Sequence, residues 1–257
     1  MSLASLDLLD KVAGIARDAG AAILVHYAGP AEVRLKEDNS PVTIADEAAE
    51  AVILPALKAL TPDVPIVSEE AASAGYVPDV APAFWLVDPL DGTKEYLKRN
   101  GEFTVNIALI EAGKPVLGVV FAPALDRMFK GAAGIGAWSE DRIGVRPIAC
   151  RHPPVDGIIV AASRSHGDNA DLNNFLARFT VAARIDAGSS LKFCLIAAAE
   201  ADLYPRFGPT MEWDTAAGHA VLAAAGGRVT DFDGTDLPYG KQGYRNGHFV
   251  AHGPSVM

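Results

Sequence analysis

One short stretch constrains the fold of this chain more than any other, because it ends an apolar segment with two acids. It runs from Trp85 to Tyr96 and reads Trp-Leu-Val-Asp-Pro-Leu-Asp-Gly-Thr-Lys-Glu-Tyr. The apolar residues at 84–88 predict a buried strand, so Asp88 and Asp91 are expected at its end, with little access to water. Two negative charges this close together in such a site need a cation to neutralise them. The stretch therefore indicates a metal-dependent phosphatase site.

The residues between and after these two acids suit metal and phosphate chemistry. Pro89 fixes its own φ and has no N–H, so it favours a stiff turn that aims both carboxylates and the Leu90 carbonyl toward one point. Mg²⁺ prefers such oxygen ligands and is often completed by a substrate phosphate. Gly92 and Thr93 are expected to open a short helix over 93–97, where free N–H groups bind anions. A tight loop with capping acids would explain this run equally well if it stood alone.

Three further acids favour the metal interpretation. Glu69 and Glu70 end a predicted short strand, and Asp214 stands at the start of a predicted apolar helix. Taken singly, each acid has an ordinary structural explanation, such as a loop position or the favourable end of a helix dipole. Together with Asp88 and Asp91 they would surround two or more cations. One metal could then activate water while another stabilises the leaving oxygen.

Composition sets the class of protein and argues against several functions. The chain has 257 residues, of which 50% are hydrophobic, so it can bury a large core as one big domain or two modest ones. Its formal net charge of -10 argues against nucleic-acid binding, which needs clustered Lys and Arg. No apolar run reaches the roughly 20 residues of a membrane span, and the N-terminus has no basic leader, so a soluble cytoplasmic protein is expected. Cys150 and Cys194 form no C-x-x-C pair, which predicts buried thiols and no disulfide.

Hydrophobic periodicity predicts two halves of different character. An amphipathic helix over 5–27 and a second helix capped by Thr43 and Asp46 precede a β-rich segment, after which strands and helices alternate. The main expected elements are strands at 65–68, 84–88, 103–110, 116–121, 157–162 and 181–185 and helices at 168–179, 190–199 and 215–225. We therefore expect an N-terminal α+β half at 1–150 with most of the metal ligands, and a C-terminal α/β half at 151–257.

Three motifs resemble those of the lithium-sensitive, Mg²⁺-dependent inositol monophosphatase superfamily, over nearly the whole chain. They are Asp88-Pro89-Leu90-Asp91-Gly92-Thr93, Ser68-Glu69-Glu70, and Trp213-Asp214 followed by Ala216 and Gly218, in the order and spacing of the family. The resemblance implies a layered α/β fold, an α/β/α/β/α sandwich of the inositol monophosphatase and fructose-1,6-bisphosphatase type. It also implies two Mg²⁺ ions per active site, with a third, weaker ion near Glu69.

The resemblance assigns these acids to two metal positions. One Mg²⁺ would be bound by Glu69, Asp88 and the Leu90 carbonyl. The second would be bound by Asp88, Asp91 and Asp214, so Asp88 would bridge the two ions.

The resemblance also implies a catalytic group. Glu69 and Thr93 would hold the attacking water, and Asp46 would be an outer partner of the same network. This is physically sensible, since a Thr hydroxyl can pass a proton toward a carboxylate while the metal lowers the pKa of the water. The residues expected to contact the reacting phosphate are Leu90, Asp91, Gly92, Thr93 and Asp214.

Further similarities favour the 3'(2'),5'-bisphosphate nucleotidase branch of the superfamily. They lie at Asn100-Gly101-Glu102-Phe103-Thr104-Val105-Asn106, Ser163-Arg164-Ser165-His166, Gly188-Ser189-Ser190-Leu191-Lys192-Phe193-Cys194 and Leu203-Tyr204-Pro205-Arg206. Inositol phosphatases usually have Ile and Thr-Asn where this chain has Leu90 and Lys94-Glu95. The positions that match the nucleotide-binding residues of the branch are His166, Ser189, Lys192 and Arg206. Without the family, Ser189 could be only a helix cap and Lys192 only a solvated charge.

The expected activity is hydrolysis of the 3'-phosphate of adenosine 3',5'-bisphosphate to AMP and phosphate, with the sulfated precursor of that nucleotide as a candidate second substrate. An inositol-1-phosphate or fructose-1,6-bisphosphate phosphatase would share every metal ligand. A non-catalytic, Mg²⁺-dependent nucleotide-binding regulator is the alternative of another class. The expected partner is a small phosphorylated nucleotide, and the chain is expected to be a monomer or a homodimer.

Overall fold

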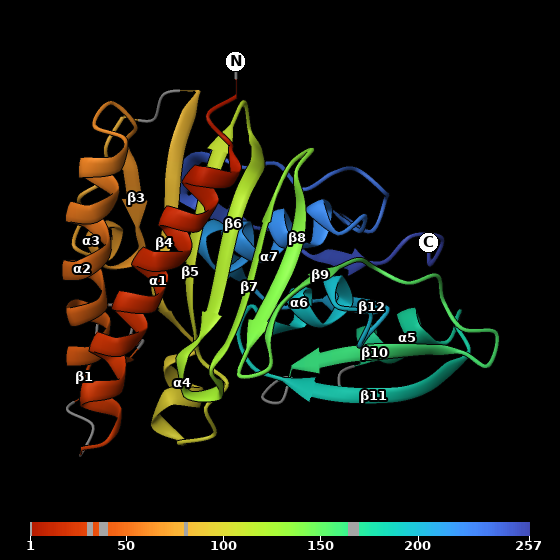
Figure 1. The fold of residues 1–257 in the computed structure, drawn as a ribbon. Coiled ribbons are helices and arrows are strands. Elements are labelled where there is room, and N and C mark those ends of the chain that lie inside the picture. Colours follow the sequence, from red (N-terminus) through yellow and green to blue (C-terminus); the bar gives the residue numbers. More distant parts are fainter. Residues whose placement is uncertain (1, 30–32, 36–40, 80–81, 164–169) are drawn as a thin grey trace.

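Two β-sheets, with helices between them and on both outer sides, organise the chain (Figure 1). The computed structural model describes residues 2–29, 33–35, 41–79, 82–163 and 170–257. Within these ranges the seven-stranded sheet contains, in spatial order, β3 (Ile66–Ser68), β4 (Ala83–Asp91), β5 (Thr104–Glu111), β6 (Lys114–Ala122), β7 (Arg127–Ala132), β8 (Gly136–Asp141) and β9 (Gly144–Ile148). The five-stranded sheet contains β11 (Val181–Ala187), β10 (Ile158–Ser163), β12 (Leu203–Arg206), β16 (Phe249–His252) and β14 (Arg228–Thr230). Two short ladders pair β1 (Val33–Leu35) with β2 (Pro41–Thr43) and β13 (Thr210–Met211) with β15 (Arg245–Asn246).

Helices separate and flank the two sheets. They are α1 (Leu6–Tyr27), α2 (Ile44–Leu60), α3 (Glu69–Ser73), α4 (Thr93–Leu97), α5 (Ala170–Leu176), α6 (Leu191–Ala197) and α7 (Glu212–Ala224), with 3₁₀ turns η1 (Pro123–Leu125) and η2 (Gln242–Tyr244). α1 and α2 pack on one face of the seven-stranded sheet and α7 on the other (Figure 1). α6 lies between α7 and the five-stranded sheet, and α5 packs on the far side of that sheet. The α/β/α/β/α order implied by the resemblance is therefore confirmed.

The helices at the N-terminus form as predicted, because each begins with a side-chain cap. In α1, the Ser5 hydroxyl accepts a hydrogen bond from the Leu8 N–H at 3.1 Å. In α2, the Asp46 carboxylate accepts from the Thr43 N–H at 2.8 Å and from its hydroxyl at 2.7 Å, which makes a capping box. The helix predicted over 5–27 and the cap predicted at Thr43 and Asp46 are confirmed. None of the helices in the described ranges is both long and apolar enough to cross a bilayer.

Strand β4 extends further than the sequence predicted. The prediction was a strand at 84–88 and a stiff turn between Asp88 and Asp91, but the strand continues through Asp91. Pro89 has no N–H to donate, so the β4–β5 ladder shifts its register between Asp88 and Asp91 and then resumes. The turn prediction was wrong. Both carboxylates lie on the last part of a paired strand, which holds them more firmly than a loop would.

The boundary predicted near residue 150 falls between the two sheets. β9 ends at Ile148 and β10 begins at Ile158, while α7 comes from the second half and packs on the first sheet. The division of the chain into two domains stays a prediction. The helix predicted at 168–179 corresponds to α5, and residues 168 and 169 lie outside the described part of the chain.

The close approach of α7 to the seven-stranded sheet depends on Gly118 in β6. A Cβ at this position would lie 2.4 Å from the Ala217 carbonyl oxygen and 2.7 Å from the Ala220 Cβ, both in α7. Overpacking of a core typically costs roughly 1–3 kcal/mol. We therefore expect Gly118→Ala to lower the free energy of unfolding by about that amount in urea denaturation.

Gly14→Ala in α1 is the matched control for this prediction. Nothing lies within 4 Å of a Cβ at Gly14, so the same substitution adds no clash there. Alanine in place of a helical glycine should raise the free energy of unfolding by about 0.5–1 kcal/mol. A Gly118→Ala protein that is as stable as the wild type would contradict the packing described here.

Candidate active site

Three carboxylates that are far apart in the sequence meet at the ends of neighbouring elements. Glu69 begins α3 directly after β3, Asp88 lies near the end of β4, and Asp214 lies in the first turn of α7. β3 and β4 are parallel neighbours, so their carboxyl ends open at the same edge of the sheet. One carboxylate oxygen of each residue lies within 4.8 Å of the other two. The structure thus brings these three predicted site residues together.

Burial and the repulsion of neighbouring acids disfavour the charged forms of Asp88 and Asp214. Burial raises the pKa of Asp88 well above its usual range, and the charges of Glu69 and Asp91 raise it further. The pKa of Asp214 is also raised well above its usual range, first by burial and then by the charge of Asp91. Hard oxygen ligands that repel one another in a buried position are what a divalent cation binds. The donor set therefore fits such a cation.

Asp91 faces the same region and is held by hydrogen bonds from two other elements. Its Oδ2 accepts from the Ser190 N–H at 2.7 Å, from the Ser190 hydroxyl at 2.9 Å and from the Asn106 amide at 3.1 Å. Burial raises the pKa of Asp91, whereas the charge of Lys192 and the hydrogen bonds from Ser190 and Asn106 lower it. The orientation of this carboxylate is therefore fixed by the protein.

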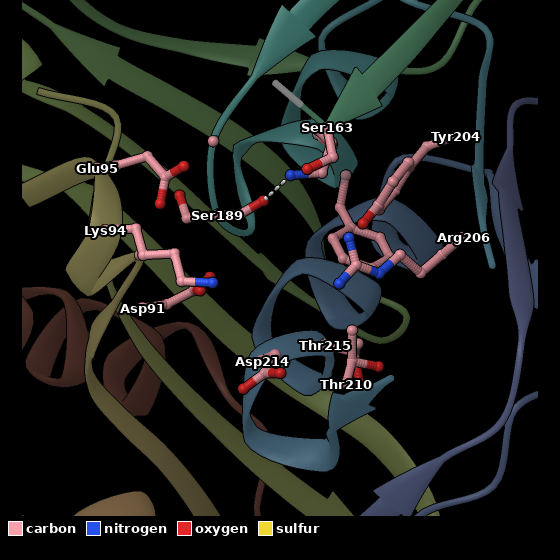
Figure 2. A pocket seen from close by; sticks show the side chains of 14 residues that line it. Asp91, Lys94, Glu95, Ser163, Ser189, Tyr204, Arg206, Thr210, Asp214 and Thr215 are labelled. Carbon is pink, nitrogen blue, oxygen red and sulfur yellow. Dashed lines mark hydrogen bonds between the residues drawn. The ribbon is translucent and has the colours of Figure 1, made fainter. Parts of the chain in front are cut away.

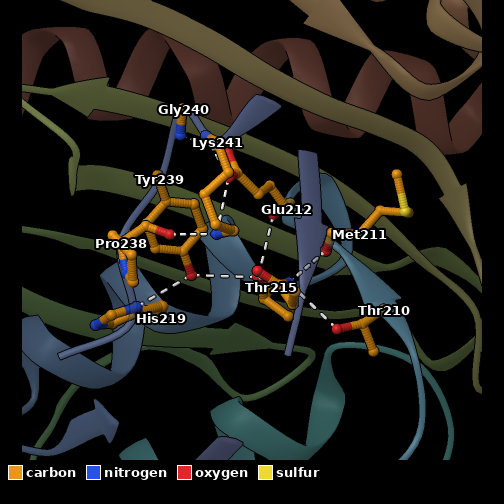
Figure 3. Close-up of polar contacts among 10 residues, drawn as sticks. Thr210, Met211, Glu212, Thr215, His219, Pro238, Tyr239, Gly240 and Lys241 are labelled. Atoms are coloured by element: carbon orange, nitrogen blue, oxygen red, sulfur yellow. Dashed lines mark hydrogen bonds and ion pairs between the residues drawn. The ribbon is translucent and has the colours of Figure 1, made fainter. Parts of the chain in front are cut away.

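An ion pair between the buried Glu212 and the partly exposed Lys241 anchors the start of α7, which carries Asp214 (Figure 3). The fully buried Glu212 carboxylate accepts hydrogen bonds from the Gly240 N–H at 2.7 Å and the Lys241 N–H at 2.9 Å, and lies 2.8 Å from the Lys241 ammonium. Loss of the Lys241 ammonium would remove the counter-charge of a buried carboxylate, which is destabilising. Asp214 in turn accepts from the Met211 N–H at 2.8 Å. The side chains of Glu212 and Asp214 therefore fix the first turn of α7 against neighbouring segments.

A polar cavity of about 130 Å³ opens beside the carboxylates (Figure 2). Figure 2 shows Asp91 and Lys94 on one side of it and Tyr204 and Arg206 on the other. Asp214 lines the cavity and also belongs to the cluster of three acids, with Glu69 and Asp88. The predicted substrate-binding residues in the lining are Asp91, Gly92, Ser189, Lys192, Arg206 and Asp214. Acidic and basic side chains that line one cavity suit a phosphorylated ligand together with a bound cation.

Lys192 is not the solvated charge that the sequence left as an alternative. Its side chain is buried, and its ammonium donates to the Ala187 carbonyl at 3.1 Å and to the Ser189 carbonyl at 2.7 Å. Burial lowers the pKa of Lys192 to about 8, although the charge of Asp91 acts in the opposite direction. An ammonium has three N–H groups. Two of them hold the loop before α6, and the third can reach a ligand in the cavity.

The loop before α6 has an unusual conformation at Ser189. Ser189 has a φ of 44°, which is uncommon for a residue with a side chain. The preceding Gly188 donates to the Glu102 carboxylate at 2.9 Å, and a Cβ on Gly188 would lie 2.6 Å from the Glu102 carbonyl oxygen. The N-cap of α6 is Ser190, so Ser189 is not a cap. Its hydroxyl is buried and has no hydrogen-bond partner in the described part of the chain, which indicates a ligand-binding role.

The remaining predicted site residues in the described part of the chain are not among those that line the cavity. Thr93 begins α4 and is not part of the cavity lining. The Leu90 side chain is buried in the core, so only its backbone carbonyl could face a ligand. Asp46 is buried in the cap of α2, and its charge contributes to the raised pKa of Asp88. His166 lies outside the described residues.

The sequence reasoning missed the roles of Thr104, Asn106 and Ser190. All three are buried polar residues, and they surround Asp91. A signal was present in β5, where Thr104 and Asn106 are two positions apart in an otherwise apolar strand and so lie on one face. Buried polar side chains on one face of a strand require hydrogen-bond partners.

Comparison with known proteins agrees with this geometry. A family model described as the inositol monophosphatase family matches residues 6–254. The 3'(2'),5'-bisphosphate nucleotidase CysQ of Escherichia coli (strain K12) is 53% identical over 237 residues, which are 90% of this chain and 94% of that protein. Among solved structures, CysQ from Bacteroides thetaiotaomicron is 35% identical with a TM-score of 0.82, and the match covers 98% of this chain and 99% of that one. An inositol monophosphatase from Anabaena (Nostoc) sp. PCC 7120 is 28% identical with a TM-score of 0.78, over 97% of this chain and 92% of that one. The chain belongs to the inositol monophosphatase family.

Proposed function

We propose that this protein is a metal-dependent 3'(2'),5'-bisphosphate nucleotidase that hydrolyses the 3'-phosphate of adenosine 3',5'-bisphosphate to AMP and phosphate. The proposal depends on one observation. A single cavity is lined both by Asp214, which belongs to the cluster of acids, and by Ser189, Lys192 and Arg206. The 53% identity to a protein named 3'(2'),5'-bisphosphate nucleotidase supports the same reaction.

The cluster of acids at the site is proposed to hold two Mg²⁺ ions, with a third, weaker one near Glu69. Glu69, Asp88 and the Leu90 carbonyl would hold one ion, and the second would be shared by Asp88, Asp91 and Asp214. When bound, Mg²⁺ would supply positive charge to the reacting phosphate and acidify a water molecule. Burial first, and then the charges of neighbouring acids, raise the pKa values of Asp88 and Asp214, and a bound cation would offset both effects.

The protein's own groups would orient the water and the reacting phosphate. Glu69 and the Thr93 hydroxyl are proposed to hold the attacking water. The hydroxyl would take up a proton from the water as it gives its own proton to the Glu69 carboxylate. Asp46 would support them from the cap of α2. The backbone N–H groups of Gly92 and Thr93 would contact the phosphate oxygens.

The phosphate that is not cleaved would lie at the basic side of the cavity. The third N–H of Lys192 would donate a hydrogen bond to this phosphate. The Ser189 hydroxyl, which lacks a partner in the described residues, would donate another. Arg206, whose Nη2 donates to the Pro209 carbonyl at 3.1 Å, would bind the same phosphate with other N–H groups of its guanidinium.

The nucleobase is proposed to occupy a second cavity that adjoins the first. This cavity measures about 240 Å³, and it shares Ser163, Tyr204 and Arg206 with the polar cavity. Its other lining residues include Leu172 and Phe207, so it is more apolar than its neighbour. Flat, apolar-faced bases bind well to such walls, and an Arg guanidinium can stack on a ring.

A panel of phosphate esters tests the proposed substrate. We expect kcat/KM for adenosine 3',5'-bisphosphate to exceed those for inositol 1-phosphate and fructose 1,6-bisphosphate by at least about 100-fold, because only the nucleotide fills both cavities. Phosphate release measured at saturating Mg²⁺ gives these values. A preference for inositol 1-phosphate would reject the assignment.

Asp91→Asn separates an enzyme from a non-catalytic regulator in the same assay. We expect phosphate release from the nucleotide to fall by at least about 100-fold in this variant, because loss of an outer partner of a metal ligand already costs about 10–100-fold and Asp91 is proposed to be a ligand itself. Nucleotide binding to the wild type without any turnover would favour the regulator.

The lowered pKa of Lys192 predicts how kcat/KM depends on pH. Its pKa is lowered to about 8, so the ammonium is charged below that pH and loses its charge as the pH rises through it. Because kcat/KM reports ionisations of the free enzyme, we expect kcat/KM for the nucleotide to fall above about pH 8. Lys192→Met should have a low kcat/KM without this alkaline decline. An identical decline in the variant would show that another group causes it.

A further inference from the structure

A single residue, Ser190, contacts the two elements that carry Asp91 and Asp214, β4 and α7. Its hydroxyl lies 2.9 Å from the Asp91 Oδ2 and 2.6 Å from the Asp214 backbone oxygen. Its backbone N–H donates to the same Asp91 oxygen at 2.7 Å. Ser190 is only 1% exposed, so water does not compete for these bonds. The start of α6 is therefore linked both to the end of β4 and to the first turn of α7.

Asn106 completes this contact from β5. Its amide donates to the Ser190 hydroxyl at 2.8 Å and to the Asp91 Oδ2 at 3.1 Å. The Thr104 hydroxyl donates to the Asn106 amide oxygen at 3.0 Å, which sets the direction of the amide. Thr104 and Asn106 are both fully buried. Strand pairing positions Asn106, whereas the two donors of Ser190 come from the start of α6.

A hydroxyl has one proton, which limits how Ser190 can bond. Because Ser190 accepts from Asn106, its own proton goes either to Asp91 or to the Asp214 carbonyl. While Asp91 is charged, the bond to its carboxylate is the stronger one. The Asp91 Oδ2 then holds three donors, two from Ser190 and one from Asn106. A cation beside Asp91 would therefore be met by the other carboxylate oxygen, Oδ1.

We propose that Ser190, supported by Asn106, is a positioning residue for the cation held between Asp91 and Asp214. This inference rests on the proposed function, which makes both acids metal ligands. The Ser190 N–H donates to one oxygen of Asp91 whichever way its hydroxyl proton points, and the hydroxyl donates either to that oxygen or to the Asp214 backbone carbonyl. Ser190 therefore fixes the orientation of Asp91 and lies in contact with both ligand-bearing segments. Ser190 also follows Ser189, which lines the substrate cavity. We expect this loop to couple cation binding to nucleotide binding, with each favouring the other because a bound cation and a bound phosphate attract.

Titration of the Ser190→Ala protein with Mg²⁺ tests the proposal. The rise in Tm caused by Mg²⁺ alone gives a half-saturating concentration without any turnover, and phosphate release gives a second one. We expect both to increase by at least about 10-fold, as is typical when an outer partner of a metal ligand is removed. kcat at saturating Mg²⁺ should change by less than about 3-fold, because Ser190 does not touch the reacting atoms in this account. AMP should lower the half-saturating Mg²⁺ concentration of the wild type but not that of Ser190→Ala.

Three further variants separate positioning from general damage. Ser190→Thr keeps the hydroxyl and should restore most of the Mg²⁺ affinity. Asn106→Ala removes a donor from a different element and should weaken Mg²⁺ binding in the same direction, so it tests the proposal even if Ser190→Ala does not fold. Ser139→Ala is the matched control, because Ser139 in β8 is equally buried and its hydroxyl has no hydrogen-bond partner in the described ranges. It should leave the Mg²⁺ titration unchanged.

The outcomes distinguish this inference from the function on which it rests. If Mg²⁺ does not raise the Tm of the wild type, the proposed metal site fails, and the role of Ser190 fails with it. If the wild type responds to Mg²⁺ and both Ser190→Ala and Asn106→Ala titrate like it, only the positioning role is overturned. The same conclusion follows if Ser139→Ala weakens Mg²⁺ binding as much as Ser190→Ala does.

Discussion

Crowded negative charge in a buried position is the constraint on which the rest of the site depends. Glu69, Asp88 and Asp214 have carboxylate oxygens within 4.8 Å of one another. Asp88 is buried, and taking a carboxylate out of water costs several kcal/mol, to which the repulsion of the neighbouring acids adds. The cost is met by packing elsewhere, since β4 is covered by apolar clusters on both faces. A divalent cation would turn this unfavourable arrangement into an attractive one.

Contacts between elements from both halves of the chain hold the acids in place. Asp91 is oriented by Ser190 at the start of α6, and the start of α7 is anchored by the pair of Glu212 and Lys241. Lys192 in α6 uses two N–H groups to hold the loop that carries Ser189. The short segment from Ser189 to Lys192 therefore orients the acid Asp91 through Ser190 and also supplies the basic Lys192 to the cavity. This explains how a chain of net negative charge can present a local site for a phosphorylated ligand.

Much of the fold and site could be predicted from the sequence because the relevant signals are local. The caps at Ser5 and Thr43 and the apolar runs determine elements by themselves, and the family motifs point to the acids that the structure brings together. The stiff turn at Pro89 was wrong, because pairing with β5 on both sides of the proline outweighs its missing donor. The burial of Lys192 could not be read from its neighbours in sequence. It depends on packing between α6 and β12, where its ammonium lies 5.1 Å from the centre of the Tyr204 ring.

The effect of Asp88→Asn on stability tests the central claim most directly. A carboxyl with a raised pKa destabilises the folded state above that pKa, and the penalty disappears as the pH falls and the group takes up a proton. We therefore expect Asp88→Asn to raise the Tm of the metal-free protein at neutral pH, with a gain that shrinks toward acidic pH. Mg²⁺ should raise the Tm of the wild type and have little effect on the variant. A metal-free Asp88→Asn protein that is less stable than the wild type, with its response to Mg²⁺ intact, would contradict the account.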